Sequence, residues 1–303
     1  MTLEQMIRRV AGQLEKADVF FGHGTDNALD EACWLVTAAL GRDPGIHDRD
    51  LGLGLEAGQV EAVEALLARR IETRRPLAYL IGHAWLAGLK FEVNEHVLVP
   101  RSPLAELIVD GFSPWLQSDA LQRAVDVGTG SGCLAIALAH YWPGVRVDAL
   151  DISEPALKLA RRNAHAHGLQ DRVECLHSDL LDAVTNRTYD LILANPPYVP
   201  RASMDNLPAE FGHEPSLGLE AGADGLDLVR RLLMQVPEVL SDHGVLICEV
   251  GEAAEAMEAL LGEQVELVWL EFARGGDGVF LLDAPACRKA AQVVAAGSDT
   301  SGT

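Results

Sequence analysis

The sequence predicts an α/β protein in which a small N-terminal helical domain and a β-hairpin connector lead into a mostly parallel, doubly wound sheet. Three observations support this prediction. Apolar residues recur at the helical period over residues 1–76, short apolar and aromatic runs follow over 77–100, and beyond these the apolar runs alternate with helical patterns. The expected domains are therefore 1–76, 77–100 and 101–285, with 286–303 as a C-terminal tail that ends in small, polar residues.

Three helices are expected in the first domain. The spacing of Thr2 and Gln5 fits a capping box at the start of the first helix. Asp26 or Asn27 is placed to cap the second helix, which Gly41 ends. The apolar positions of the three helices are, in order, Leu3, Met6, Ile7, Val10 and Leu14, then Leu29, Cys33, Val36 and Leu40, then Val60, Val63, Leu66, Leu67 and Ile71. These patterns indicate a compact helical module.

The connector is expected to be a hairpin between Ala78 and Val99, because its apolar and aromatic runs are grouped around Gly82 and Gly88 and stop at Pro100. Beyond it, the apolar runs that predict strands cover residues 124–127, 145–150, 172–177, 191–194 and 245–250. In an open sheet of this kind ligands bind at the carboxyl ends of the strands, so the residues that follow each run are candidates for a site.

Composition limits the function classes. The chain has 303 residues, of which 49% are hydrophobic, and no window approaches the roughly 18 uninterrupted apolar residues of a membrane span, so we expect a cytoplasmic protein. The net charge of −21 would repel a phosphate backbone, which makes nucleic acid an unfavourable main partner, whereas it would attract a basic protein. A simpler reading is that the charge only aids solubility.

The five cysteines are widely scattered and contain no CxxC pair, which argues against a disulfide framework and a structural zinc site; no metal is expected. They are Cys33, Cys133, Cys175, Cys248 and Cys287.

The first candidate site is a glycine-rich turn between a strand and a helix. Alternating glycines allow a tight turn and let a ligand approach the backbone. The phosphate-binding patterns fit poorly, because no Lys-Ser or Lys-Thr follows and Cys133 stands where a dinucleotide motif has its last glycine. The turn could also serve only as a turn. Its candidate ligand-binding residues are Asp126, Gly128, Thr129, Gly130, Ser131 and Gly132.

The next two strands also end in acidic residues. Asp151, followed by Ile152, stands where a carboxylate can accept hydrogen bonds from both hydroxyls of a ribose. Asp179 could accept from an adenine amino group, with Leu180 packed on the ring. Each aspartate has an alternative role as a helix cap, or for Asp179 as part of a turn.

The most informative motif is Asn195-Pro196-Pro197-Tyr198, directly after the fourth apolar run. Two prolines fix their φ angles and donate no backbone hydrogen bonds, so the carbonyls before them stay available at the end of a strand. Four strand ends thus carry polar or glycine-rich segments, and we expect them to form one site.

These motifs resemble those of the S-adenosylmethionine-dependent amino-methyltransferases, which have a Rossmann-like sheet. The resemblance implies that S-adenosyl-L-methionine is bound by the turn, by Asp151, Ile152, Asp179 and Leu180, and by Asn195. It also implies that the Asn195 side-chain oxygen and the Pro196 carbonyl accept hydrogen bonds from the two N–H groups of the nitrogen that is methylated. Tyr198 would pack against the target group. Pro197 and Arg101 would complete the substrate site.

A narrower resemblance covers residues 1–283. Arg75-Pro76-Leu77-Ala78-Tyr79-Leu80 and the runs 91–93 and 97–101 look like the hairpin region of bacterial protein-glutamine methyltransferases, which modify release factors and ribosomal proteins. The chain resembles the branch that methylates large-subunit ribosomal protein three at residues 22–27, 101–103, 213–215, 248–251 and 275–278. The implied partner is that ribosomal protein or a ribosome assembly intermediate, docked on the helical domain.

Three other functions stay open at this point: release-factor methylation, adenine methylation in nucleic acid, and an assembly factor that binds the cofactor without turnover. The roles of His23, His83 and His213 are also open, with a structural role the more common one for a loop histidine. The basic cluster of Arg69, Arg70, Arg74 and Arg75 could contact RNA or an acidic surface, but we expect a solvated helix end.

Overall fold

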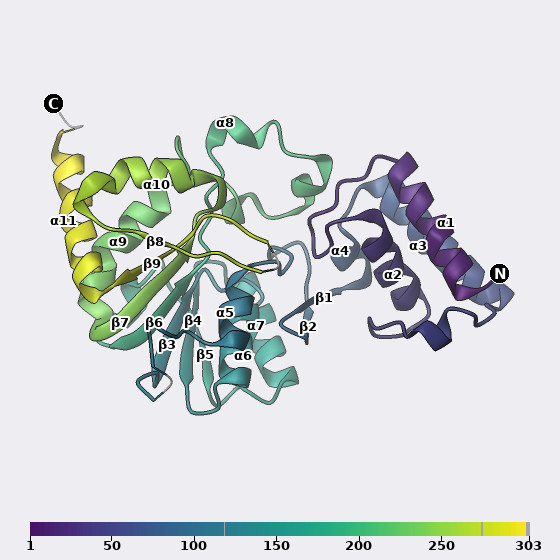
Figure 1. Ribbon diagram of the computed structural model, residues 1–303, viewed down its shortest axis with the longest axis horizontal. Helices are drawn as coiled ribbons and strands as arrows, with labels where there is room; N and C mark the ends of the chain where they lie inside the picture. The colour runs from purple at the N-terminus through teal and green to yellow at the C-terminus, as the bar shows by residue number, and fades with distance from the viewer. Residues whose placement is uncertain (118, 274, 301–303) are drawn as a thin grey trace.

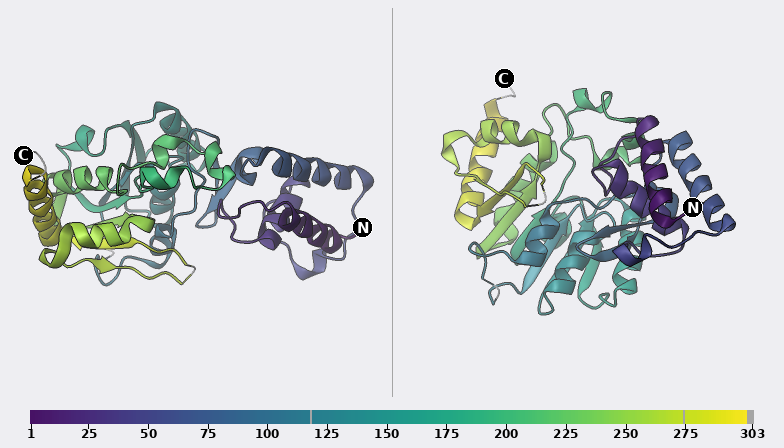
Figure 2. Two further views of the ribbon diagram at one scale, coloured as in Figure 1. Left: turned by 90° about the horizontal axis from the view of Figure 1, so that it is seen from above. Right: turned by 45° about the vertical axis from the view of Figure 1, so that its right-hand side comes forward.

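The computed structural model describes residues 1–117, 119–273 and 275–300, with side chains up to residue 297. A helical domain lies beside a larger α/β domain, as Figure 1 shows, and Figure 2 shows that it projects from one end of that domain. The helical domain consists of α1 (Leu3–Lys16), α2 (Ala28–Ala39), η1 (Asp48–Asp50), α3 (Ala57–Thr73) and α4 (Leu77–Ile81).

The predicted helices of the first domain are present, with one change in the core. Thr2 and Gln5 form the predicted capping box, and Asn27 rather than Asp26 caps α2 by accepting a hydrogen bond from the Asp30 amide at 2.9 Å. Leu29, assigned by its spacing to the apolar face of α2, is instead 51% exposed. The apolar faces of α1, α2 and α3 share one core, which includes Met6, Leu14, Leu35, Val63 and Leu67.

The connector is shorter than predicted. Its strands are β1 (His83–Leu86) and β2 (Leu89–Glu92), which pair antiparallel around a turn at Ala87 and Gly88. The residues before them form α4 instead of strand, because Pro76 is placed to begin a helix and Gly82, at φ +78°, ends it in the left-handed conformation.

The α/β domain is built on a seven-stranded sheet in the order β5-β4-β3-β6-β7-β9-β8. Strands β3 to β7 are parallel, while β9 pairs antiparallel with both β7 and β8. The strand order reverses at β3, which lies between β4 and β6, so the crevice for a ligand is expected at the ends of these strands. The strands are β3 (Arg123–Val127), β4 (Arg146–Asp151), β5 (Val173–His177), β6 (Tyr189–Ala194), β7 (Leu240–Glu249), β8 (Val268–Trp269) and β9 (Val279–Asp283).

Helices cover both faces of the sheet, which confirms the predicted α/β class. All five predicted strands are present, whereas β8 and β9 were not predicted. The helices are α5 (Leu104–Asp110), α6 (Cys133–Tyr141), α7 (Glu154–Ala166), α8 (Arg201–Met204), α9 (Asp227–Val239), α10 (Ala254–Leu261) and α11 (Ala284–Thr300). The short 3-10 helices are η2 (Asp182–Val184), η3 (Ala209–His213), η4 (Ser216–Gly218), η5 (Gly251–Ala253) and η6 (Gly262–Gln264).

The C-terminal segment corrects the prediction of a separate tail from residue 286. That boundary cuts through α11, which packs against α9 and contributes Cys287, Ala290 and Val294 to the core. These residues are small or apolar and recur at helical spacing, so they bury one stripe despite the polar composition around them. The polar C-terminal end was expected to fray, but its first residues belong to α11, which extends to Thr300. Residues 301–303 lie outside the described residues. No helix within the described residues is both long and apolar enough to span a membrane.

Candidate active site

A cavity of about 640 Å³ opens at the carboxyl ends of β3, β4, β5 and β6, and a volume of this size is typical of ligand sites. The four predicted strand ends therefore meet in one place. The lining includes most of the predicted site residues: Arg101, Gly128, Thr129, Gly130, Ser131, Asp151, Ile152, Asp179, Leu180, Asn195, Pro196, Pro197 and Tyr198.

Asp126 and Gly132 are described by the structure but do not line the cavity, and their contact with a ligand stays a prediction. The Asp126 carboxylate is buried and accepts hydrogen bonds from the Thr129 hydroxyl at 2.6 Å and the Ala135 amide at 3.2 Å. Its burial raises the pKa of Asp126 to about 6. A Cβ at Gly132 would lie 3.1 Å from Ala160, so this glycine lets α7 pack close. Both residues therefore support the glycine-rich turn without lining the cavity.

Asp151 joins the glycine-rich turn to α7. Its carboxylate accepts hydrogen bonds from the Gly130 amide and the Ser153 amide, each at 2.8 Å. Ser153, and not Asp151, caps α7 through the Ala156 amide, so the capping alternative for Asp151 is wrong. Each carboxylate oxygen keeps a further lone pair for a ligand. Burial raises the pKa of Asp151.

Asp179 has a partner that the sequence did not indicate. Arg231 from α9 donates to its carboxylate at 2.8 Å, and both residues line the cavity. Beside them, Leu180 adopts a φ of +51° and contributes an apolar surface. Ile152 also lines the cavity and is 47% exposed, so two aliphatic side chains are available to a flat apolar ligand.

The Asn195-Pro196-Pro197-Tyr198 motif meets the end of β7. The Tyr198 hydroxyl donates to Glu249 at 3.2 Å, and Asn195 and Glu249 line the same cavity. Burial and the adjacent Glu249 charge raise the pKa of Tyr198, so it stays protonated near neutral pH. The sequence showed Glu249 only as part of a family pattern and did not indicate this role.

Gly251 makes room for the Tyr198 ring, and this carries a prediction. Its φ is +45°, and an added Cβ would lie 2.6 Å from the ring. Gly251→Ala is therefore expected to displace Tyr198 and lower kcat by about tenfold to a hundredfold, because small displacements of positioning groups are costly. Initial rates of the methyl transfer that the sequence motifs lead us to expect check this, with Gly144→Ala as the control, since a Cβ at Gly144 meets nothing within 4 Å. Equal rates for the two variants would contradict the prediction.

Arg101 reaches the cavity from the end of the connector. It donates two hydrogen bonds to Glu214, at 2.6 and 2.7 Å, and its guanidinium lies 5.6 Å from the centre of the Phe211 ring. Burial alone would raise the pKa of Glu214, but the adjacent His23 and the hydrogen-bonded Arg101 lower it to about 2. His23, 3.4 Å from Glu214, thus supports the site from the helical domain.

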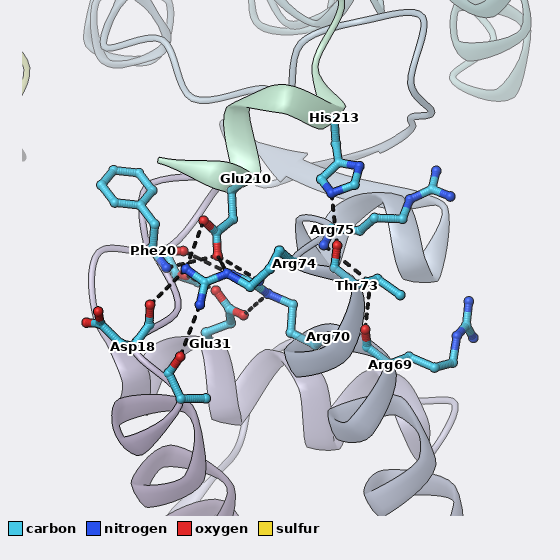
Figure 3. A network of polar contacts seen from close by, with 12 residues as sticks. Asp18, Phe20, Glu31, Arg69, Arg70, Thr73, Arg74, Arg75, Glu210 and His213 are labelled. Atoms are coloured by element: carbon cyan, nitrogen blue, oxygen red, sulfur yellow. Dashed lines mark hydrogen bonds and ion pairs between the residues drawn. The ribbon is translucent and has the colours of Figure 1, made fainter. Parts of the chain in front are cut away.

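The arginines at the end of α3 are not simply a solvated helix end. Arg69 is exposed as expected, but Arg70 is fully buried and donates to Glu31 at 2.7 Å and to Glu210 at 3.1 Å. Arg74 also binds Glu210, at 2.9 Å, as Figure 3 shows. Glu210 lies in η3, so buried ion pairs join the helical domain to the loop that follows the Asn-Pro-Pro-Tyr motif.

The other two histidines have structural contacts. His213 lies 2.9 Å from the Thr73 carbonyl, at the same domain junction, and His83 lies 3.2 Å from the Ile81 carbonyl. Burial lowers the pKa of His83. The cavity lining, within the part of the chain that the structure describes, includes none of the three histidines.

Comparisons with known proteins agree with this geometry. Residues 111–213 match the methyltransferase small domain family. The hMettl16 catalytic domain, solved in complex with the MAT2A 3′UTR hairpin 6, has the same fold at 16% identity, with a TM-score of 0.51 over 79% of this chain and 87% of that one.

Two curated relatives are much closer. Ribosomal protein uL3 glutamine methyltransferase of Xylella fastidiosa (strain Temecula1) is 47% identical over 95% of this chain and 91% of its own length. The protein of the same name from Xanthomonas campestris pv. campestris is 47% identical over 95% and 92%. At this identity over nearly its whole length, the chain belongs to the ribosomal protein uL3 glutamine methyltransferase family.

Proposed function

We propose that this protein transfers the methyl group of S-adenosyl-L-methionine to the side-chain amide nitrogen of a glutamine in ribosomal protein uL3. The observation that carries the proposal is the single cavity in which Asp151 and the glycine-rich turn lie next to Asn195 and Tyr198. The relatives' name supports the choice of substrate over a release factor. The net charge of −21 favours a basic protein over nucleic acid.

The residues present fit the cofactor. Asp151 is placed to accept the ribose hydroxyls, because its oxygens retain free lone pairs beside the two backbone amides that hold it. Gly128 and Gly130 have φ values of +75° and +55° and line the cavity without side chains, which leaves room for the amino-acid portion. Leu180 and Ile152 offer apolar contacts to the adenine. When bound, the sulfonium supplies an electrophilic methyl group.

The acceptor half of the cavity suits an amide nitrogen. This nitrogen is a weak nucleophile because its lone pair is delocalised into the carbonyl. The Asn195 side-chain oxygen and the Pro196 carbonyl would accept hydrogen bonds from the two N–H groups of this nitrogen. They would orient it toward the methyl group and stabilise the positive charge that develops. Tyr198, held by Glu249, would pack against the amide plane. The new N–C bond forms as the sulfur–methyl bond breaks, the nitrogen then loses one of its two protons to water, and no side chain forms a covalent intermediate.

Cofactor binding should depend on Asp151. In Asp151→Asn an NH2 group replaces one acceptor oxygen. In one orientation of the new amide a ribose hydroxyl is left unpaired, and in the other the NH2 group faces the Gly130 amide, which is also a donor. We expect the Kd for S-adenosyl-L-methionine to rise by about tenfold to a hundredfold. Isothermal titration calorimetry measures this change, and Asp171→Asn, at an exposed position, is the control. A Kd within about threefold of wild type would contradict the assigned contact.

The test of the proposed function is mass spectrometry of purified uL3 and of a peptide release factor, each incubated with the protein and labelled S-adenosyl-L-methionine. A methyl group on a glutamine of uL3 that Asn195→Ala fails to transfer is the expected result. Labelling of the release factor alone would replace the proposed substrate. Labelling of neither protein would reject the proposal for free substrates, and ribosome assembly intermediates would then be assayed in the same way.

A further inference from the structure

Glu214 joins three segments that lie far apart in the sequence. Its carboxylate is fully buried and accepts hydrogen bonds from the Val99 amide at 3.0 Å and from two nitrogens of Arg101 at 2.6 and 2.7 Å. The Nε2 atom of His23 lies 3.4 Å from the same carboxylate. Glu214 follows η3, Val99 and Arg101 stand at the end of the connector, and His23 lies between α1 and α2. One carboxylate therefore links both domains and the connector.

The segments that meet at Glu214 form the outer walls of the cavity, which do not come from the sheet. One outer wall consists of residues 96–102, and the other includes Leu207, Phe211, Pro215, Leu217, Gly218 and Leu219. The second wall belongs to a loop that is closed at its base, where the Val199 amide donates to the Leu219 carbonyl at 2.8 Å. Glu210 and His213 hold this loop to the helical domain (Figure 3), and Glu214 holds it to the connector.

The contact between the walls requires a carboxylate. The fork of a guanidinium matches two carboxylate oxygens, and such a bidentate pair fixes geometry as well as charge. In Glu214→Gln the side chain accepts at one oxygen only, and in either orientation its NH2 group faces a donor of Arg101. The variant also leaves the Arg101 side chain, which is 27% exposed, without its counter-charge. Loss of the carboxylate therefore releases the two walls from one another.

The outer walls are where a protein substrate would meet the cavity. A folded protein is far larger than a cavity of about 640 Å³, so only the side chain of its glutamine can reach the Asn-Pro-Pro-Tyr motif. The residues on either side of that glutamine then lie against the outer walls. The proposed cofactor contacts, in contrast, come from the strand ends, whereas the side-chain contacts of Glu214 within the described residues go to the connector and the helical domain.

We propose that Glu214 is a positioning residue that holds Arg101 and the end of the connector against the loop after the Asn-Pro-Pro-Tyr motif, and so shapes the surface that binds the residues around the target glutamine. The inference rests on the proposed function for the identity of the substrate, and on geometry alone for the contact between the walls. Glu214 itself, although it is a described residue, is not part of the cavity lining, so it acts through Arg101 and Val99.

Initial rates at varied uL3 concentration test the proposal. Glu214→Gln should raise KM for uL3 by about tenfold to a hundredfold, and by more than kcat falls, because the acceptor motif is unchanged. The Kd for S-adenosyl-L-methionine, measured by calorimetry, should stay within about threefold of wild type. A fall in kcat with an unchanged KM, or a loss of cofactor binding as large as the loss of activity, would overturn the proposal.

Glu31→Gln is the matched control for a merely structural role. Glu31 is also buried at the domain junction and accepts from Arg70 at 2.7 Å, but neither residue is among the described lining of the cavity. Arg70 keeps Glu210 in this variant, so η3 stays in place. Both variants should unfold at a lower urea concentration than wild type, but only Glu214→Gln should raise KM. An equal rise in KM in the two variants would show that Glu214 acts through stability alone, against the proposal.

Hydrogen exchange of the free protein, followed by mass spectrometry, is a readout that needs no substrate. In Glu214→Gln the amides of residues 96–102 should exchange at least about tenfold faster than in wild type, because the Val99 amide loses its acceptor. The glycine-rich turn should exchange as in wild type, and Glu31→Gln should leave both segments unchanged. Unaltered exchange of residues 96–102 in Glu214→Gln would overturn the proposal even in an active enzyme.

Glu214→Asp is the second variant and takes the place of Glu214→Gln if that protein does not fold. It keeps the charge, but its side chain is one methylene shorter and cannot reach the Val99 amide and both Arg101 nitrogens together. It should also raise KM and speed exchange of residues 96–102, each by a smaller factor, and no change in either would contradict the proposal. A wild-type protein that does not methylate uL3, while its variants show the faster exchange, would instead refute the proposed function and keep Glu214 as the contact between the walls.

Discussion

Asn195→Ala is expected to lower kcat by about a hundredfold to a thousandfold, the cost of removing one preorganised hydrogen-bonding group from a site of charge development. The variant loses the side-chain amide oxygen that is proposed to accept a hydrogen bond from the acceptor nitrogen. The Pro196 carbonyl remains, but a single acceptor no longer fixes the plane of the amide. Because Asp151 and the glycine-rich turn, the proposed cofactor-binding segments, stay intact, cofactor affinity should change by no more than a few-fold.

Single-turnover transfer to uL3 measures the loss, and calorimetry with S-adenosyl-L-methionine measures cofactor binding separately. Asn206→Ala is the matched control, because Asn206 is an exposed asparagine on the loop that follows the same motif. It should methylate at the wild-type rate. Loss of cofactor binding in Asn195→Ala, in proportion to its loss of activity, would show that Asn195 serves the cofactor instead of the acceptor.

Arg70→Met is expected to lower the free energy of unfolding by about 3 to 5 kcal/mol, the typical effect of removing one partner from a buried ion pair. Arg70 is fully buried and is shared by Glu31 and Glu210, both of which are buried. The methionine fills part of the volume but leaves Glu31 without its arginine and Glu210 with only Arg74. The penalty comes from these uncompensated charges more than from the lost attraction.

Urea denaturation followed by tryptophan fluorescence measures this effect, since Trp34 lies in the core of the helical domain. Arg8→Met is the control: Arg8 forms an exposed pair with Glu4, and such pairs contribute about 1 kcal/mol or less. Similar losses of unfolding free energy in the two variants would mean that the ion pairs between the domains stabilise the fold no more than ordinary surface pairs do. Because Glu210 belongs to η3, Arg70→Met should also raise KM for the protein substrate.

The sequence by itself determined the chemistry of the cavity. The glycine-rich turn and the Asn-Pro-Pro-Tyr motif are contiguous segments, and each directly follows an apolar run that marks a buried strand. Parallel strands end at one edge of a sheet, so the shared direction of the strands brings Asp151, Asp179 and Asn195 to that edge, where the structure has one cavity. The helix caps at Thr2 and Asn27 are equally local.

Only the tertiary structure decided which charges are buried and what they bind. Arg70 and Glu210 are 140 positions apart, and Ser102 and Glu249 are 147 apart. In a sequence every charged residue is expected to be solvated, because the partner that offsets its desolvation lies on another element. The inward position of Asp126 behind its turn and the burial of one stripe of α11 have the same origin. Packing between distant segments thus turned an expected surface cluster into the junction that holds the active-site loop.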